Sequence, residues 1–187
     1  MLKYNNVIKD NKNYNDLTIK EIVPIMKLNI RGKKREFFTN VGKILNMILP
    51  TEANTSSVND KHTSIWLSPD EWMIHSNDSI ENNNNSYELE ELLYSSVSKN
   101  NLGSVSDVSD QFVMINMEGK NIFELLSSGC PLNFNEFKEK EGSTAQTVLN
   151  HIDVIIHNKK NNNVNLFVRR SFSEHLFSWL NDAASRL

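Results

Sequence analysis

Apolar residues recur every three to four positions in four stretches of the chain, and this period predicts four amphipathic helices. We expect them over residues 34–48, 87–98, 120–128 and 171–184. The apolar positions expected on their buried faces are Phe37, Val41, Ile44, Leu45 and Ile48 in the first helix, Leu89, Leu92, Leu93 and Val97 in the second, Ile122, Leu125 and Leu126 in the third, and Phe172, Leu176, Trp179, Leu180 and Ala183 in the fourth.

Shorter apolar stretches between turn residues predict strands. They cover residues 25–30, 62–68, 71–76, 112–117, 146–157 and 164–170. The second and third flank the turn Ser68-Pro69-Asp70, so they are predicted to form a hairpin. Two asparagine runs, Asn82–Asn85 and Asn161–Asn163, are predicted to be loops.

The order of these elements repeats along the chain. The stretches "MKLNIRGKKREFFTNVGKIL" and "VMINMEGKNIFELLSSGCPL" share a strand, a glycine turn and a helix, and each is followed by two strands and another helix. The repeat predicts an α+β fold of two similar β-α-β-β-α halves, close to split βαβ units. We expect a single domain over residues 25–187 with pseudo-repeats at about 25–100 and 105–187, preceded by a loosely attached polar arm of residues 1–24.

Two helix ends carry sequence signals. Ser171 is followed three residues later by Glu174, a capping-box pattern that predicts the start of the last helix. The third predicted helix is followed by Gly129, expected in the left-handed conformation that ends helices, and by Pro131, which cannot continue one. Cys130 between them is therefore favoured as a small buried side chain over a reactive thiol.

Composition narrows the class of protein. The chain has 187 residues, a net charge of −3 and a pI of about 6.0, so no global basic field attracts nucleic acid. Its single cysteine excludes an internal disulfide. We find neither an apolar core of signal-peptide length near Met1 nor a run of about 18 apolar residues, so we expect a cytoplasmic protein without a membrane partner.

Histidine and carboxylate residues in "HIDVIIH" form the first candidate site. Alternation along a strand would put His151, Asp153 and His157 on one face, and these residue types bind metals. The two histidines are roughly 20 Å apart along an extended strand, so one ion cannot bridge them. We interpret the three residues as the polar outer face of a half-buried strand.

Ser171, His175 and Asp182 offer the residue types of a catalytic triad on the last helix. A nucleophilic serine needs a strained elbow and an oxyanion hole, and the chain contains no G-x-S-x-G. It also contains no G-x-G-x-x-G and no P-loop, so nothing predicts a bound nucleotide. From the residues alone, we predict no catalytic, cofactor-binding or metal-binding residue in this chain.

Two stretches have no evident role inside the predicted fold. In "IWLSPDEWMI", Trp66 and Trp72 are either core residues or anchors for a partner, because aromatic residues dominate interface hot spots. "KLNIRGKKRE" crowds cations near a helix start, where the helix dipole disfavours them, and forms either a solvated turn or a docking site for an acidic partner. Its cations are Lys27, Arg31, Lys33, Lys34 and Arg35.

Four stretches of the sequence resemble a known family. They are "IWLSPDEWMI", "SDVSDQFVMINMEGKNIFELLSSGCPLNF", "STAQTVLNHIDVIIH" and "NLFVRRSFSEHLFSWLNDAAS", and the "GCPL" and "RSF…WL" motifs are the most specific. Over about residues 60–187, the chain resembles the gamma subunit of heterotetrameric sarcosine oxidase. The resemblance implies a fold related to the folate-binding domain of the glycine-cleavage T-protein.

The resemblance also implies a function. It implies a complex that oxidatively demethylates sarcosine to glycine, passing the one-carbon unit to tetrahydrofolate or releasing formaldehyde, with hydrogen peroxide formed. It places FAD, FMN, NAD and tetrahydrofolate in the alpha and beta subunits, and zinc in the delta subunit. This chain is then a non-catalytic structural subunit without cofactors, and the alpha subunit is its expected direct contact.

Two alternatives stay open: a stand-alone folate-dependent aminomethyltransferase and a folate-binding regulatory protein. The chain is shorter than the transferases require, and no residue matches their catalytic aspartate. The regulatory proteins carry a signature of the form K-G-C-Y-x-G-Q-E, whereas Cys130 is followed here by "PLNFNE".

Overall fold

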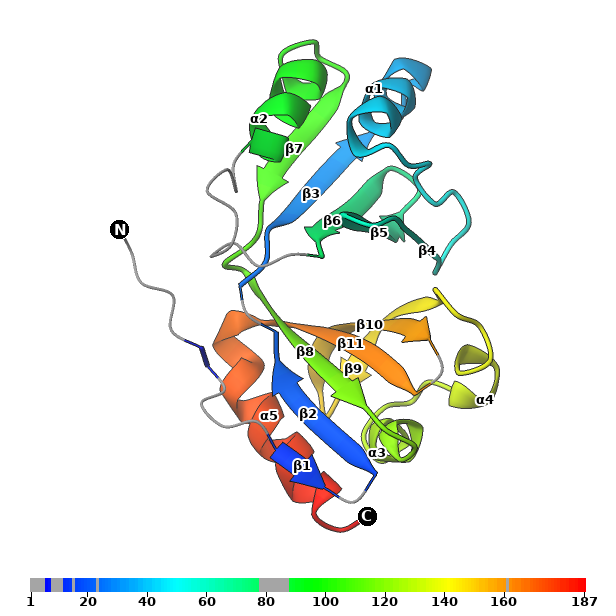
Figure 1. The fold of residues 1–187 in the computed structure, drawn as a ribbon, viewed down its shortest axis with the longest axis vertical. Coiled ribbons are helices and arrows are strands. Elements are labelled where there is room, and N and C mark those ends of the chain that lie inside the picture. Colours follow the sequence, from blue (N-terminus) through cyan, green and yellow to red (C-terminus); the bar gives the residue numbers. More distant parts are fainter. Residues whose placement is uncertain (1–5, 8–11, 15, 23, 78–87, 161) are drawn as a thin grey trace. The chain divides into compact units, whose positions relative to one another are not determined.

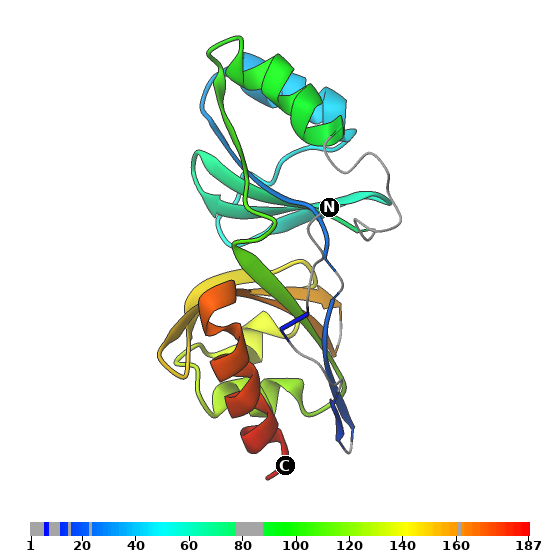
Figure 2. The same cartoon turned by 90° about the vertical axis from the view of Figure 1, so that its left-hand side faces the viewer.

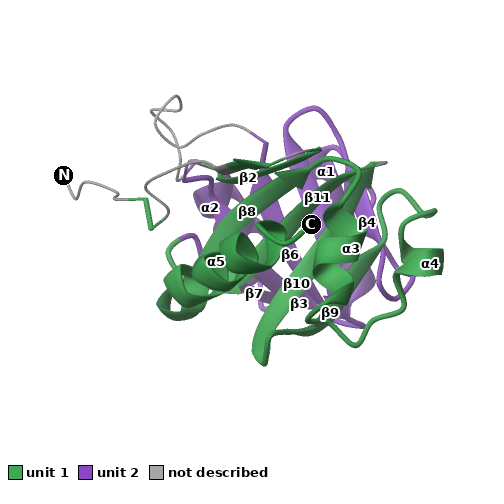
Figure 3. Cartoon of the chain, turned by 90° about the horizontal axis from the view of Figure 1, so that it is seen from below, with its two compact units in different colours: residues 1–23, 110–187 green, residues 24–109 purple. Residues whose placement is uncertain are grey.

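The structure is a computed structural model that describes residues 6–7, 12–14, 16–22, 24–77, 88–160 and 162–187. The chain divides into two compact units, shown in different colours in Figure 3. Unit 2 is the continuous segment Pro24–Ser109, whereas unit 1 combines Met1–Val23 with Asp110–Leu187. Each unit has its own antiparallel sheet (Figure 1). Each unit also has its own apolar core.

Unit 2 is built on a five-stranded sheet in the order β4-β5-β6-β3-β7. Its elements are β3 (Lys27–Gly32), α1 (Arg35–Leu45), β4 (Ser56–Val58), β5 (His62–Ser68), β6 (Glu71–Ser76), α2 (Glu88–Leu93), the π-helical turn η2 (Tyr94–Ser98) and β7 (Gly103–Asp107). The predicted hairpin is confirmed as β5 and β6. Figure 2 shows α1 and α2 side by side, and their buried residues pack against one face of this sheet.

The core of unit 2 forms where α1 meets β3 and β6. Phe37, Val41 and Leu45 follow each other at intervals of four residues, so one face of α1 buries all three. Trp72 is 1% exposed; its indole Nε1 donates a hydrogen bond to the carbonyl oxygen of Pro50 at 2.8 Å. The ring of Phe37 lies 5.8 Å from the Trp72 ring, centroid to centroid. Trp72 is therefore a core residue rather than an interface anchor.

Unit 1 is built on a six-stranded sheet in the order β1-β2-β8-β11-β10-β9. Its elements are β1 (Lys12–Tyr14), β2 (Leu17–Glu21), β8 (Phe112–Glu118), α3 (Ile122–Ser127), α4 (Phe134–Phe137), β9 (Thr144–Leu149), β10 (Ile152–Lys160), β11 (Asn163–Arg169) and α5 (Arg170–Ala184). The predicted single strand 146–157 is wrong, because it is a hairpin. Asn150 and His151 have φ angles of 49° and 65°, which suit the two-residue turn between β9 and β10.

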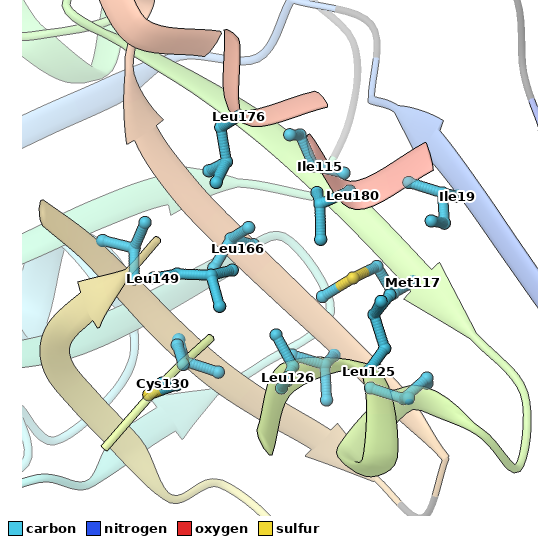
Figure 4. Close-up of a cluster of buried hydrophobic side chains, with 14 of the residues drawn as sticks. Ile19, Ile115, Met117, Leu125, Leu126, Cys130, Leu149, Leu166, Leu176 and Leu180 are labelled. Carbon is cyan, nitrogen blue, oxygen red and sulfur yellow. The ribbon is translucent and has the colours of Figure 1, made fainter. Parts of the chain in front are cut away.

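The core of unit 1 lies between the sheet and the helices α3 and α5 (Figure 4). Side chains of α3 and α5 meet alternate residues of the central strands, as expected for a sheet with one face covered. The fully buried apolar residues here include Ile19, Ile115, Met117, Leu125, Leu126, Leu149, Leu166, Leu176 and Leu180. Cys130 belongs to the same cluster, next to Leu126 and Leu149 in the close-up.

Three apolar residues predicted to face the core are exposed instead. Ile48 is 85% exposed, because α1 ends at Leu45 and Asn46 adopts the left-handed conformation that stops the helix. Leu92 is 51% exposed in α2, and Phe172 is 50% exposed in the first turn of α5. The buried positions of α5 are Ser173, Leu176, Leu180 and Ala184.

The N-terminal residues correct the predicted domain division. Leu17 and Ile19 of β2 are 3% and 0% exposed, and β2 pairs with the central strand β8 of unit 1. A segment that contributes a strand and two core side chains is not a loosely attached arm. The predicted single domain of residues 25–187 is also replaced by two units, and β2 belongs to a different unit from the strand that follows it.

The two units have equivalent strand orders. Reading β7-β3-β6-β5-β4 beside β2-β8-β11-β10-β9 matches β3 with β8, and β4, β5 and β6 with β9, β10 and β11, which have the same places in the order strand, helix, three strands, helix. β7 and β2 have the same place in their sheets but not in the chain, since β7 follows α2 and β2 precedes β8. The α+β class and the two similar halves are therefore confirmed, although three strands were predicted in each half and the sheets have five strands in unit 2 and six in unit 1. β7 pairs with β3 and lies in the segment that leads into unit 1. β2 pairs with β8 and lies in the segment that leads into unit 2.

Candidate functional site

The first candidate set, in "HIDVIIH", does not come together. His151 is exposed in the hairpin turn and Asp153 is exposed on β10, whereas His157 is 1% exposed. The interpretation as a polar outer face is therefore wrong for His157. Among the described residues, no group of three or more histidine, cysteine, aspartate or glutamate side chains could hold a metal ion.

The second candidate set lies on α5 and is exposed. The helix begins at Arg170, one residue before Ser171, and its N-cap residue Arg169 makes no side-chain cap hydrogen bond. Ser171 therefore stands inside the first turn, and the predicted capping box is wrong. His175 and Asp182 are also exposed, and Asp182 pairs with the guanidinium of Arg186.

Cys130 is a structural residue. It is 8% exposed in the core of unit 1, with its Sγ 3.6 Å from Oγ1 of Thr147. Gly129 does not adopt the left-handed conformation that was expected, since its φ is not positive. It is needed for another reason: a Cβ at this position would lie 2.6 Å from the indole of Trp179.

The basic turn and the tryptophan hairpin of unit 2 pair with each other. Arg31 lies 3.5 Å from Asp70 and 3.8 Å from Glu71, and Lys33 lies 3.5 Å from Asp70. A hydrogen bond from the Ser68 hydroxyl, together with Lys33 and Arg31, lowers the pKa of Asp70 below its ordinary 3.8. Within unit 2 the two stretches therefore contact each other, and the side chains of Arg31 and Lys33 stay 53% and 78% exposed, as in the solvated-turn alternative.

The remaining residues of these stretches are also largely accounted for. Lys34 Nζ donates to the carbonyl oxygen of Asn101 at 3.2 Å. Lys27 is 3% exposed, and its Nζ donates to the carbonyl oxygens of Ile25 and Ser109. Trp66 is half-buried against the core of unit 2.

A buried asparagine cluster in unit 1 was not foreseen. Nδ2 of Asn116 donates to Oδ1 of Asn163 and to Oδ1 of Asn165, both at 2.9 Å. Nδ2 of Asn163 in turn donates to the carboxylate of Glu118 at 2.7 Å. The signal in the sequence is the alternation of Asn116 and Asn165 with apolar neighbours on β8 and β11, which places them on the sheet face opposite the core. Asn163 belongs to β11, not to a loop as predicted.

Each unit also has a surface hollow. In unit 1, a hollow of about 550 Å³ lies across β8, β11, β10 and β9 and is lined by Phe112, Gln146, Thr147, Val148, Asp153, Val154, Ile155 and Arg169. In unit 2, a hollow of about 430 Å³ lies between α1, α2 and the loop before β5, lined in part by Ile44, Leu89 and Leu92. No described helix is long and apolar enough to cross a membrane.

Solved structures of other proteins share this fold. Heterotetrameric sarcosine oxidase from Corynebacterium sp. U-96, in complex with pyrrole 2-carboxylate, matches with a TM-score of 0.81 and 21% identity, over 91% of this chain and 84% of that chain. Glycine cleavage system aminomethyltransferase T from Bartonella henselae matches with a TM-score of 0.61 and 14% identity, over 88% of this chain and 45% of that chain. The relation to the T-protein fold is therefore confirmed.

The family is shown by the sequence itself. No curated protein matches the chain. The model of the sarcosine oxidase gamma subunit family, however, matches residues 32–186, which is most of the chain and extends further toward the N-terminus than the resemblance over residues 60–187. This chain belongs to the sarcosine oxidase gamma subunit family.

Proposed function

We propose that this chain is the gamma subunit of a heterotetrameric sarcosine oxidase and that it acts through its contacts with the other subunits. The observation that carries the proposal is the family match over residues 32–186. The alpha, beta and delta subunits are the proposed partners, with the alpha subunit in direct contact. A cytoplasmic location of the complex stays a prediction.

The proposed complex oxidatively demethylates sarcosine to glycine. The one-carbon unit goes to tetrahydrofolate or leaves as formaldehyde, and hydrogen peroxide is formed. In this proposal FAD, FMN, NAD, tetrahydrofolate and zinc belong to the partner subunits, and this chain supplies no catalytic residue.

The positions of the chemically capable side chains support a non-catalytic role. Cys130 is packed in the core, with its Sγ 3.6 Å from the hydroxyl oxygen of Thr147. The carboxylate of Asp70, whose pKa is lowered, accepts a hydrogen bond from Ser68 and forms ion pairs with Arg31 and Lys33 of its own unit. Side chains that serve the fold in this way are not displayed toward a substrate.

A stand-alone aminomethyltransferase is the second candidate, because the fold resembles aminomethyltransferase T. The chain spans only 45% of that protein, which argues against it. A transferase of this kind would turn over a folate substrate without any partner, so the two candidates differ in what the isolated chain can do.

Co-expression with the alpha, beta and delta chains tests the proposal. With an affinity tag on this chain, we expect a yellow complex that oxidises sarcosine, whereas the isolated chain is colourless and inactive. Cys130→Ala should assemble normally and leave the turnover of the complex unchanged. Failure of the wild-type chain to co-purify, or folate-dependent turnover by the isolated chain, would favour the aminomethyltransferase candidate.

A further inference from the structure

An apolar hollow lies in unit 2 where the last turn of α1 meets the first turns of α2. Ile44 comes from α1, Leu89 and Leu92 come from α2, and all three line the hollow of about 430 Å³. Ile44 and Leu89 are half-buried against the core of unit 2, whereas Leu92 is 51% exposed. An exposed leucine beside an apolar hollow is typical of a surface on which another molecule packs.

The helix that carries Leu92 belongs to an acidic stretch of the chain. Between His75 and Lys99, the sequence has no lysine, arginine or histidine. The carboxylate residues in this stretch are Asp78, Glu81, Glu88, Glu90 and Glu91. Three of them lie in α2, and α2 itself contains no basic residue. The helix therefore has a negative charge that no cation of the same helix offsets.

The carboxylates of α2 lie close to Leu92 along the helix. Glu88 precedes Leu92 by four residues, which places both on the same side of the helix, and Glu88 also lines the hollow. Glu91 is exposed and adjoins Leu92 in the chain. Partial burial raises the pKa of Glu90, and the like charges of Asp107 and Glu91 raise it further. An exposed apolar side chain thus stands in a negative field.

The opposite wall of the hollow leaves this balance unchanged. It includes Asp60 and Lys61 from the loop before β5, and His62 at the start of β5. Asp60 and Lys61 have opposite charges, so the negative excess at the hollow comes from α2.

Charge complementarity decides between the possible occupants of the hollow. Residues 77–87, which precede α2 in the same chain, include Asp78 and Glu81 and no lysine or arginine, so like charge disfavours them. The same repulsion disfavours an acidic partner, and an uncharged partner would gain nothing from the negative field. A segment with a lysine or arginine next to an apolar side chain matches both the charge and the apolar lining.

We propose that a basic segment of a partner subunit docks on α2 of unit 2, with an apolar side chain in the hollow beside Leu92 and a lysine or arginine facing Glu88 and Glu91. Burial of the apolar side chain supplies affinity, and the opposite charges set the orientation and speed the association. The inference rests on the proposed role of this chain as a subunit of a complex.

Photo-crosslinking in the co-expressed complex identifies what lies on this surface. A photo-reactive amino acid in place of Leu92 should link to a peptide of a partner subunit that carries a net positive charge. The control position is Phe172 of α5, which is 50% exposed and so matches Leu92. The same amino acid there should not link to this peptide. A linked peptide without a net positive charge, or one from this chain or from a second copy of it, would overturn the inference.

Two substitutions test the apolar and the charged contact separately. Leu92→Asp should reduce the amount of partner chains that co-purify about tenfold, as for a central interface residue, whereas Phe172→Asp should leave it unchanged. Glu91→Lys should reduce co-purification about threefold at low salt and less at high salt, because salt screens the interaction between charges. Glu174→Lys is its control, since Glu174 is an exposed glutamate on α5. Urea unfolding first shows that each variant is folded, and if Leu92→Asp is not, Glu91→Lys and the crosslink decide.

The outcomes separate this inference from the proposed function. A wild-type chain that fails to co-purify with its partners contradicts the proposed function itself. A wild-type chain that co-purifies, while the α2 variants co-purify equally well and position 92 yields no crosslink, overturns the docking inference alone. Equal losses for the α2 and α5 variants would overturn it too, because they would reflect a general effect of changed surface charge.

Discussion

Gly129 lies directly against the indole of Trp179: a Cβ at position 129 would meet Cη2 and Cζ2 of that ring at 2.6 Å. Gly129→Ala should therefore lower the free energy of unfolding by about 1–3 kcal/mol, the usual cost of overpacking. Trp179→Phe shortens the ring and should relieve the clash, so the double variant should lose less than the sum of the single variants. Urea unfolding of the four proteins measures this, and additive losses would contradict the contact.

Two serines in the first turn of α5 should behave differently. Ser173 is fully buried, and its Oγ donates to the carbonyl oxygen of Arg170 at 2.7 Å. Ser173→Ala should cost about 1 kcal/mol, as expected for one intramolecular hydrogen bond. Ser171→Ala is the control and should change stability by less than about 0.5 kcal/mol, because Ser171 is exposed and caps nothing. A larger loss for Ser171→Ala than for Ser173→Ala would restore the capping-box interpretation.

The strand β2 should contribute to the stability of unit 1. Ile19 is completely buried and lies beside Met117 of β8 in the register. Ile19→Ala should lower the free energy of unfolding by about 2–5 kcal/mol through the lost contacts and the cavity left behind. Asn13→Ala, on the exposed part of β1, is the matched control. Thermal unfolding that is insensitive to Ile19→Ala would mean that the segment is a loose arm after all.

Asp70 should make the stability of unit 2 depend on pH in the acidic range. Its pKa is lowered by the hydrogen bond from Ser68 and by Lys33 and Arg31. The folded state therefore favours the ionised carboxylate more than the unfolded state does. The contribution of Asp70 to the free energy of unfolding is therefore fully present above the ordinary pKa of 3.8, and it is lost as the pH falls through the lower pKa of the folded state.

Asp70→Asn and Ser68→Ala test the direction of this pH dependence. The difference in unfolding midpoint between wild type and Asp70→Asn should be constant at neutral pH and should shrink below a pH of about 4. Ser68→Ala should raise the pKa of Asp70, measured by NMR titration of the carboxyl carbon. A pKa of Asp70 that stays the same in Ser68→Ala would contradict the assigned hydrogen bond.

The sequence predicts the helices and the central strands well, because these elements carry strong apolar periods. It predicts α1 from Phe37, Val41 and Leu45, and the two similar halves follow from the order of such elements. It misplaces Phe172, since the spacings 172/176/179 and 173/176/180 both fit a helical period and only the sheet decides between them. The exposed Ile48 is misassigned because Asn46 ends the helix in a conformation that the apolar period does not reveal.

Strands that depend on a partner strand are missed. β2 has only Leu17 and Ile19 as apolar signal, and β7 reads "GSVSD" with Val105 alone. Such strands form because a neighbour supplies the hydrogen bonds and the buried face, so their propensity is context-dependent. The pairing of Arg31 with Asp70 is missed for the same reason, because it depends on which strands lie next to each other.

The central claim is that this chain is a non-catalytic subunit of a sarcosine oxidase complex. Native mass spectrometry of the protein purified through a tag on this chain, after co-expression with the alpha, beta and delta chains, tests it most directly. The account predicts a heterotetramer that contains one copy of each chain and oxidises sarcosine, with no turnover by the chain alone. A chain that remains free in the presence of its partners, or that turns over substrate without them, would contradict the account.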